Sequence, residues 1–244
     1  MGEGTLYLVS TPIGNLKDIT FRALEVLRES DLILAEDTRT TRKLLTHYQI
    51  KGKRLLSFYS YNAKSRIPQI IHYLKEGKNL ALVSEAGTPG ISDPGYILVK
   101  RAIEEGIDVK PIPGASAFLS ALIISGLPTQ EFHFGGFLPS TGKMRRRKLK
   151  KIKDCHATLV FYVSPHRIEK SLQDIKKILG NRRMALVREV TKVFEEIIRG
   201  KIDEILEVLE KNPEKKKGEM VLVISEESDK EEELGKRQIF SGEI

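Results

Sequence analysis

The feature that most restricts the fold is a regular alternation of short apolar runs with longer amphipathic segments in the first half of the chain. The runs have the length of strands, and they cover residues 5–11, 31–37, 54–58, 79–85 and 107–113. The segments between them have helical periodicity near residues 18–29, 40–48, 66–76 and 96–105. Strands that alternate with such helices are joined by right-handed crossovers. Residues 1–114 are therefore predicted to form an α/β domain with a largely parallel sheet.

A second α/β domain is predicted over residues 115–225. A proline-punctuated turn leads into an apolar helix at about residues 113–125, which is typical of a domain junction. Further strands are expected at residues 132–138, 157–163, 183–189, 193–199 and 219–225. The gap between Glu189 and Val193 is too short for a crossover helix, so this sheet must be mixed. Residues 226–244 form a charged C-terminal tail without apolar periodicity, which we expect to be frayed or disordered.

The composition indicates a globular protein with a basic body. The 244 residues are 40% hydrophobic, enough for a sizeable core. The formal charge is +8, and because residues 226–244 hold seven acidic and three basic side chains, the rest carries +12. Such a charge attracts polyanions.

Cys155 is the single cysteine and no histidine pair has metal-site spacing, so we expect no disulfide and no metal. Without a signal-like or membrane-length apolar run, we expect a soluble, cytoplasmic protein without a membrane partner.

Three loops that follow predicted strands are candidates for a shared ligand site. They are TPIGN around Pro12, SEAGTPGISDPGY around Gly87 and PIPGASA around Ser116. In open α/β sheets, ligands bind in the crevice outside the carboxyl ends of the strands. Glycine permits close approach to a ligand, and a helix start favours an anionic group. The glycine fingerprints of dinucleotide and nucleoside-triphosphate sites are absent, and independent structural turns are the alternative.

Two charged segments suggest catalysis and anion binding. AEDTRTTRKLL (35–45) places Glu36, Asp37 and Arg39 at a strand end, and these are the catalytic candidates. Their alternative role is structural, in a helix cap or a dimer interface. GKMRRRKLKKIK (142–153) carries eight bases without an acid, above a narrow apolar stripe of Met144, Leu149 and Ile152. Phosphate binding is favoured over a solvated face, and the predicted contacts are Arg145, Arg146, Arg147, Lys148, Lys150 and Lys151.

The loop motifs resemble a known family. TLYLVSTPIGNLKDIT, LILAEDTRTT, LALVSEAGTPGISDPGY, PIPGASAFLSAL, FGGFLP, FYVSPHR, REVTK and KGEMVLVI occur in order from Thr5 to Ile224. Together they are similar to the tetrapyrrole-methylase superfamily, in its bacterial branch of small-subunit ribosomal RNA methyltransferases. Two positions depart from the pattern, because SEAGTP stands where tetrapyrrole-modifying relatives often have G-D-P, and Glu85 stands where many RNA-modifying relatives have aspartate.

The resemblance implies a two-domain tetrapyrrole-methylase-like fold with the cofactor cleft between the domains, and a homodimer. It further implies S-adenosylmethionine as cofactor and 2′-O-methylation of a cytidine ribose in the decoding region, on small-subunit ribosomal RNA or the assembled 30S subunit. The cofactor contacts expected on this basis are Pro12, Ala86, Gly87, Ser116, Ala117, Tyr162 and Met220.

Two other functions stay open at this point. A tetrapyrrole (precorrin-type) methyltransferase would share the fold and the cofactor, but it gives no reason for the basic run at residues 142–153. A non-enzymatic RNA-binding module would explain that run but would leave the three strand-end loops without a role.

Overall fold

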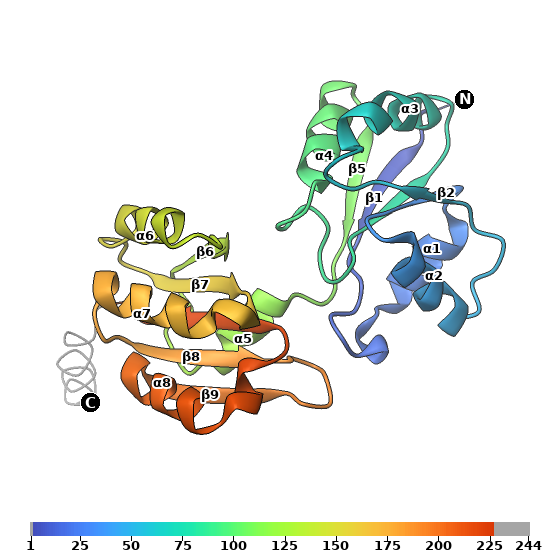
Figure 1. Cartoon of the computed structure of the whole chain (residues 1–244). Coiled ribbons are helices and arrows are strands. Elements are labelled where there is room, and N and C mark those ends of the chain that lie inside the picture. The colour runs from blue at the N-terminus through green and yellow to red at the C-terminus, as the bar shows by residue number, and fades with distance from the viewer. Residues whose placement is uncertain (1, 227–244) are drawn as a thin grey trace, which may run out of the picture. The chain divides into compact units, whose positions relative to one another are not determined.

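The computed structural model describes residues 2–226 and divides the chain into two compact units. The first unit ends at Ala117 and the second begins at Phe118, close to the predicted junction after residue 114. The predicted tail lies outside the described residues except for Glu226. Figure 1 shows an open sheet with covering helices in each unit.

The first unit contains a five-stranded sheet in the order β3-β2-β4-β1-β5, and all its pairings are parallel. This confirms the largely parallel sheet predicted from the alternating pattern. The strands are β1 (Thr5–Val9), β2 (Leu32–Ala35), β3 (Leu55–Ser57), β4 (Leu80–Val83) and β5 (Asp108–Ile112). The helices are η1 (Leu16–Asp18), α1 (Phe21–Glu29), α2 (Thr38–His47), α3 (Ala63–Lys75) and α4 (Gly95–Glu104).

Two helices of the first unit start earlier than predicted. Helix α2 begins at Thr38 rather than Thr40, because the Asp37 carboxylate caps it by accepting from the Arg39 amide at 2.7 Å. Helix α3 begins at Ala63 rather than Arg66, after a turn in which Asn62 Oδ1 accepts from the Tyr59 amide at 2.8 Å. Pro68 lies inside α3. The Asp37 cap thus sets the start of α2, whereas Asn62 shapes the turn before α3 without capping the helix.

The second unit contains a five-stranded mixed sheet in the order β6-β7-β10-β8-β9. The β6–β7 pair is parallel and the other pairs are antiparallel, which confirms the predicted mixed sheet. The strands are β6 (Phe132–Phe137), β7 (Thr158–Val163), β8 (Arg183–Arg188), β9 (Glu196–Lys201) and β10 (Met220–Ile224). The helices are α5 (Ala117–Ile124), α6 (Gly142–Lys151), η2 (Pro165–Arg167), α7 (Ile168–Leu179), α8 (Ile202–Lys211) and η3 (Pro213–Lys216).

The β8–β9 connection differs from its prediction. Strand β9 begins at Glu196 rather than Val193, and Val193 and Phe194 are 93% and 75% exposed in the turn before it. Glu189 and Thr191 in this turn both have positive φ, at 48° and 67°. Non-glycine residues rarely adopt this conformation, so the surrounding structure must hold it in place.

Alternating side chains of the strands build separate cores on the two faces of the first sheet. Helices α3 and α4 pack on the face that presents Leu6, Leu80 and Leu82, and α1 and α2 pack on the face that presents Ile33 and Val83. Coverage of both faces explains why the strand segments are continuously apolar.

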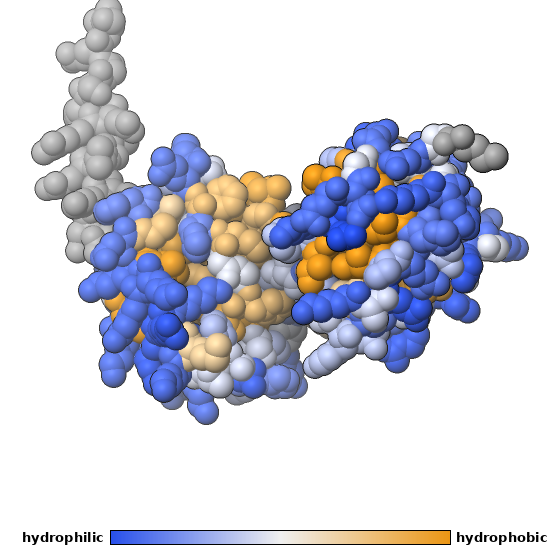
Figure 2. Space-filling view, turned by 90° about the horizontal axis from the view of Figure 1, so that it is seen from above, coloured by the Kyte–Doolittle hydropathy of each residue, from blue (hydrophilic) through white to orange (hydrophobic). Residues whose placement is uncertain are grey.

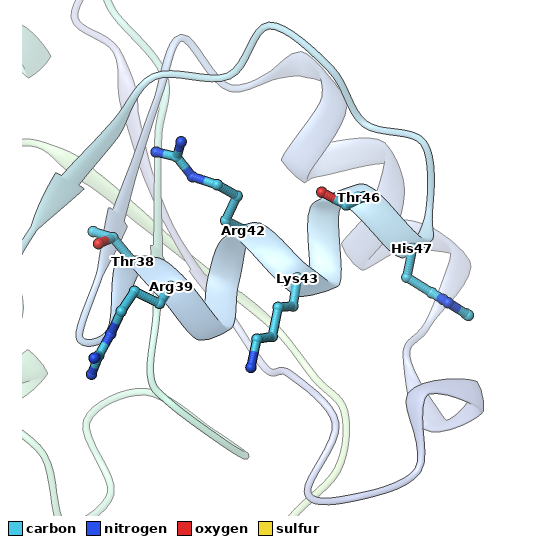
Figure 3. A pocket seen from close by; sticks show the side chains of 6 residues that line it. All are labelled: Thr38, Arg39, Arg42, Lys43, Thr46 and His47. Atoms are coloured by element: carbon cyan, nitrogen blue, oxygen red, sulfur yellow. The ribbon is translucent and has the colours of Figure 1, made fainter.

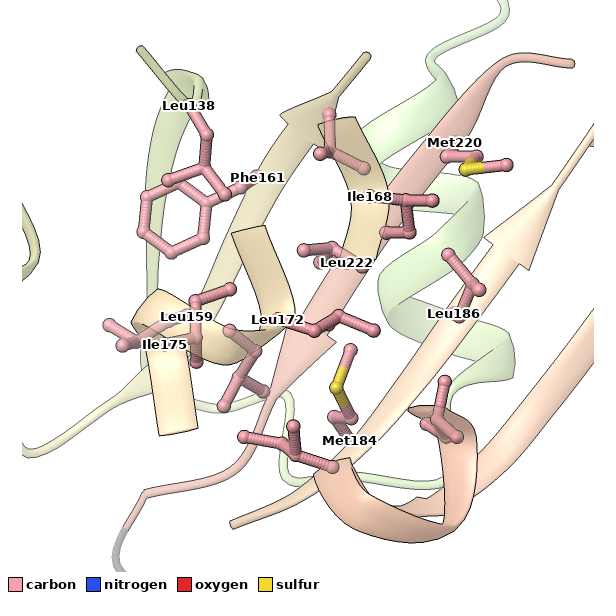
Figure 4. Close-up of a cluster of buried hydrophobic side chains, with 14 of the residues drawn as sticks. Leu138, Leu159, Phe161, Ile168, Leu172, Ile175, Met184, Leu186, Met220 and Leu222 are labelled. Carbon is pink, nitrogen blue, oxygen red and sulfur yellow. The ribbon is translucent and has the colours of Figure 1, made fainter. Parts of the chain in front are cut away.

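The second unit has its own core. Leu159 and Phe161 of β7 and Leu222 of β10 pack against Leu172 and Ile175 of α7 (Figure 4). Among residues 2–226, no helix has both the length and the apolar character needed to cross a bilayer.

Candidate functional site

The three predicted strand-end loops of the first unit are joined by hydrogen bonds. The Thr11 amide donates to the Gly87 carbonyl at 2.9 Å, and the Gly87 amide donates back to Thr11 at 3.1 Å. Ser10 Oγ donates to Thr88 Oγ1 at 3.1 Å, and Thr88 Oγ1 donates to the Ala115 carbonyl at 3.3 Å. The loops after β1, β4 and β5 therefore form one connected group at the carboxyl edge of the sheet.

Glycine is required where these loops approach one another. Gly87 has φ of 80°, and a Cβ atom there would lie 3.3 Å from Ile13 Cγ2. A Cβ atom at Gly114 would lie 2.9 Å from Ser10 Cβ. The Oγ1 atom of Thr11 is buried without a hydrogen-bond partner in the described part of the chain. Buried hydroxyl groups normally form hydrogen bonds. The Thr11 hydroxyl therefore has a hydrogen bond still to make at the point where the loops meet.

The other residues predicted to contact a cofactor lie in both units. Pro12, Ser116 and Ala117 are half-buried, and Ala86 is exposed. Tyr162 and Met220 belong to the second unit, in the neighbouring strands β7 and β10. Burial raises the pKa of Tyr162, and a hydrogen bond from the Phe118 backbone amide opposes this shift. A shared role of these two residues with the loops of the first unit stays a prediction.

Glu36 lies at the same edge of the first sheet as the loop after β4. Its Oε2 atom accepts from the Glu85 amide at 3.2 Å, and its own amide donates to the Val83 carbonyl at 3.3 Å. Burial raises the pKa of Glu36, and the charges of Asp93 and Glu85 raise it further, while the hydrogen bond from Glu85 opposes them. A carboxylate with a raised pKa is suited to accept a proton near neutral pH.

Asp37 and Arg39 form a local ion pair. Oδ2 of Asp37 lies 2.8 Å from Nη2 of Arg39, and the Arg39 side chain is 86% exposed. Hydrogen bonds from Arg39 lower the pKa of Asp37 to about 2. Asp37 thus caps α2 and stays ionised, which makes it a weak proton acceptor. The Arg39 side chain contacts the Asp37 carboxylate through Nε and Nη2, and a catalytic role for either residue stays a prediction.

The basic helix α6 is only partly available to a ligand. Arg145 is 4% exposed, and its Nε donates to Asp174 Oδ2 at 2.8 Å, so its prediction as a phosphate contact is wrong. Nη1 of Arg146 lies 3.1 Å from Asp174 Oδ1. Nζ of Lys148 donates to the carbonyls of Gly135 and Phe137, and burial lowers its pKa. The members of the basic run that are exposed and make no ion pair within residues 2–226 include Arg147, Lys150 and Lys151.

The sequence lacked any local acid in this run, but the fold supplies one from α7. Helices α6 and α7 pack together, and this packing places Asp174 beside Arg145 and Arg146. The predicted apolar stripe is also only partly correct. Leu149 is fully buried and Ile152 packs against the core, whereas Met144 is 63% exposed.

Two further features were not selected from the sequence. In the β8–β9 turn, Glu189 Oε1 accepts from the Glu219 amide at 2.6 Å and from Lys192 Nζ at 3.0 Å, which joins the REVTK and KGEM motifs. Burial raises the pKa of Glu189, but these hydrogen bonds outweigh it and lower the pKa overall.

The second feature is a hollow on α2 beside Arg42 and Lys43 (Figure 3). Arg42 and Lys43 follow Arg39 by three and four residues, and this helical spacing of basic residues was the signal in the sequence that could have indicated the hollow.

Within residues 2–226, no group of three or more histidine, cysteine, aspartate or glutamate side chains is placed to hold a metal ion.

Comparison with known proteins identifies the family. The profile of tetrapyrrole (corrin/porphyrin) methylases matches residues 5–206, and the chain therefore belongs to this family. A curated relative from Thermotoga maritima is 52% identical over 222 residues, which cover 91% of this chain and 98% of the relative. Another from Halalkalibacterium halodurans is 55% identical over 202 residues, covering 83% of this chain and 70% of the relative. Both are named ribosomal RNA small subunit methyltransferase I.

Solved structures share the fold at low sequence identity. A diphthine synthase has a TM-score of 0.67 at 14% identity, with 91% of this chain and 90% of that chain covered. Uroporphyrin-III C-methyltransferase from Thermus thermophilus, complexed with S-adenosylhomocysteine, has a TM-score of 0.60 at 17% identity, with 91% and 98% covered. These similarities confirm the predicted tetrapyrrole-methylase-like α/β fold.

Proposed function

We propose that this protein uses S-adenosylmethionine to methylate the ribose 2′-oxygen of a cytidine in the decoding region of small-subunit ribosomal RNA. The observation that carries the proposal is the nearly full-length similarity to relatives named ribosomal RNA small subunit methyltransferase I. The specific nucleotide and the 2′-oxygen follow from the motif resemblance given above. Exposed bases on α6 support an RNA substrate over a tetrapyrrole.

The strand-end loops of the first unit fit the cofactor. Gly87 and Gly114 allow close backbone approach, and the buried Thr11 Oγ1 offers a hydrogen bond that no described residue uses. Pro12, Ala86, Gly87, Ser116 and Ala117 would hold the cofactor at these loops, and Tyr162 and Met220 are cofactor contacts expected from the motif resemblance. When bound, S-adenosylmethionine supplies an activated methyl group.

The residues beside these loops would prepare the acceptor. A ribose hydroxyl is a poor nucleophile while it carries its proton, so a nearby base accelerates the reaction. Glu36 is the best candidate, because burial raises its pKa and its carboxylate is held against the Glu85 amide. Asp37 and Arg39 would position the start of α2 beside it. Much of the remaining acceleration comes from alignment of the reacting groups.

A homodimer is part of the proposal. Helix α5 is apolar around its circumference, and Leu119 and Ile123, four residues apart, are 47% and 66% exposed. Residues at this spacing share one helix face. Figure 2 shows that hydrophobic surface reaches solvent between hydrophilic side chains. A second copy would cover the exposed face of α5. A 27.6 kDa species alone in light scattering at micromolar concentration would contradict the dimer.

The test uses the full-length protein in two steps. Titration calorimetry should detect binding of S-adenosylmethionine and S-adenosylhomocysteine, and absence of both would overturn the enzymatic proposal. Small subunits from cells that lack this protein are then incubated with the protein and S-adenosylmethionine. They should gain a ribose methyl group on a decoding-region cytidine, which mass mapping detects. Cofactor binding with methylation of a precorrin instead of ribosomal RNA would favour the tetrapyrrole alternative.

A further inference from the structure

Helix α2 of the first unit exposes two parallel rows of polar and basic side chains. Residues spaced by four lie on one side of a helix, about 6 Å apart along its axis. One row is Thr38, Arg42 and Thr46, and the other is Arg39, Lys43 and His47. These six residues line a shallow hollow of about 640 Å³ (Figure 3). The opposite side of α2 is fixed in the core by Leu44 and Leu45.

The positive charges of this face are available to a ligand. Arg42 and Lys43 are exposed, and neither forms an ion pair with any residue between 2 and 226. Arg39 pairs with Asp37, but its side chain is 86% exposed. No acidic residue occurs from Thr38 to His47. This differs from α6, where Asp174 neutralises Arg145 and Arg146.

The arrangement fits an extended polyanion better than a single small anion. Asp37 already accepts from the Arg39 amide at the start of α2, so the side chains and not the helix terminus offer the binding groups. The cations are distributed along more than one helical turn, and threonine hydroxyls lie among them. Nucleic-acid backbones are bound by this combination of Arg, Lys and Thr side chains.

The position of α2 relates this face to the proposed chemistry. Helix α2 directly follows β2, and the intervening Glu36 is hydrogen-bonded to Glu85 in the loop after β4. A nucleic-acid strand bound on α2 would therefore pass the edge of the β-sheet where the loops after β1, β4 and β5 lie.

We propose that the exposed face of α2 binds the phosphate backbone of the RNA whose ribose is methylated, as a surface additional to α6. This inference rests on the proposed function. Arg42 and Lys43 supply its main charges, and Thr38 and Thr46 supply hydroxyl donors.

The test combines Arg42→Gln and Lys43→Gln in the full-length protein. The matched control combines Lys64→Gln and Lys100→Gln, which remove the same charge from exposed positions on α3 and α4, across the sheet. Binding of a decoding-region RNA fragment is measured against salt concentration. Because each phosphate contact contributes about 0.7 to 0.9 to the slope of log K against log salt, the α2 variant should lose about 1.4 to 1.8.

Other measurements separate the possible failures. Both variants should bind S-adenosylmethionine like the parent, which shows that they are folded, and Arg42→Lys should keep the parental slope. If the parent methylates the RNA but the α2 variant has the slope of the control, the α2 inference alone is wrong. If the parent neither binds nor methylates the RNA, the proposed function fails and the inference fails with it.

Discussion

Nε of Arg145 donates a 2.8 Å hydrogen bond to Oδ2 of Asp174 in the interior of the second unit. The same guanidinium donates to the Pro139 carbonyl at 3.3 Å. Arg147, two positions further along α6, is exposed. Two arginines that look equivalent in the sequence therefore have different roles, and the difference can be measured.

Arg145→Gln should lower the free energy of unfolding by about 3 kcal/mol, because it leaves the buried Asp174 carboxylate with a weaker set of partners. Arg147→Gln should change it by less than about 0.5 kcal/mol, as is usual at an exposed position. Urea unfolding of both variants provides the comparison. Equal stabilities would contradict a structural role for Arg145.

A combined change of Arg147, Lys150 and Lys151 to glutamine should weaken RNA binding and reduce its salt slope by about 2.1 to 2.7. S-adenosylmethionine affinity should stay at the parental value. The charge-conserving variant Arg147→Lys, Lys150→Arg, Lys151→Arg is the control, and it should keep a slope near that of the parent. If the glutamine variant binds RNA like the parent at every salt concentration, these residues form only a solvated face.

Glu36→Gln should reduce single-turnover methylation by about 10²- to 10⁴-fold if Glu36 is the general base. In the parent, the rate should rise with pH through the raised pKa of Glu36, because only the ionised form accepts a proton. The variant should lose this part of the pH profile, whereas Glu85→Gln should retain it. An unchanged rate and pH profile in Glu36→Gln would exclude Glu36 as the base.

The same pKa shift predicts the sign of the effect on stability. A carboxyl group whose pKa is raised on folding stabilises the protein below its unfolded pKa, and this contribution is lost as the pH rises through the folded value. Glu36→Gln should therefore not destabilise the protein at neutral pH, so lost activity cannot be attributed to unfolding. Thermal unfolding at two pH values checks this.

Gly87→Ala should lower stability by about 1 to 3 kcal/mol, since a side chain is strained at φ of 80°. It should also weaken S-adenosylmethionine binding, because the new methyl group would press on Ile13 and disturb the Thr11–Gly87 pair. Gly90→Ala is the control, with φ of 89° but open space around its Cβ position. Calorimetry should show weaker cofactor binding in the first variant only, and equal losses in both would argue against a cofactor role for the Gly87 loop.

The parallel first sheet and the mixed second sheet were predictable because strand and helix periodicities are local. Buried side chains recur with helical period along α7, and β7 is a short continuous apolar run, so the type and burial of both elements are already visible in the residue pattern. Proline and glycine marked the loops around Pro12, Gly87 and Ser116. The ordered motifs from Thr5 to Ile224 were enough to indicate the family.

Contacts between residues that are distant in the chain could not be predicted from these local patterns. The Thr11–Gly87 bridge, the contact of Glu36 with the Glu85 amide and the neutralisation of Arg145 by Asp174 each join segments that are far apart in the chain. Only the packing of the strands and helices brings them together.

The sequence by itself determined where bases and glycines are concentrated, and the tertiary structure decided which of them are free to act. Successive residues on a helix point about 100° apart, so Arg145 enters the interior while Arg147 faces solvent, although both belong to one run of arginines. On α2 the same geometry directs Leu44 into the core and leaves Lys43 exposed without an ion pair in the described part of the chain. Charge is a property of composition, but its availability to a ligand depends on which neighbours the fold places beside it.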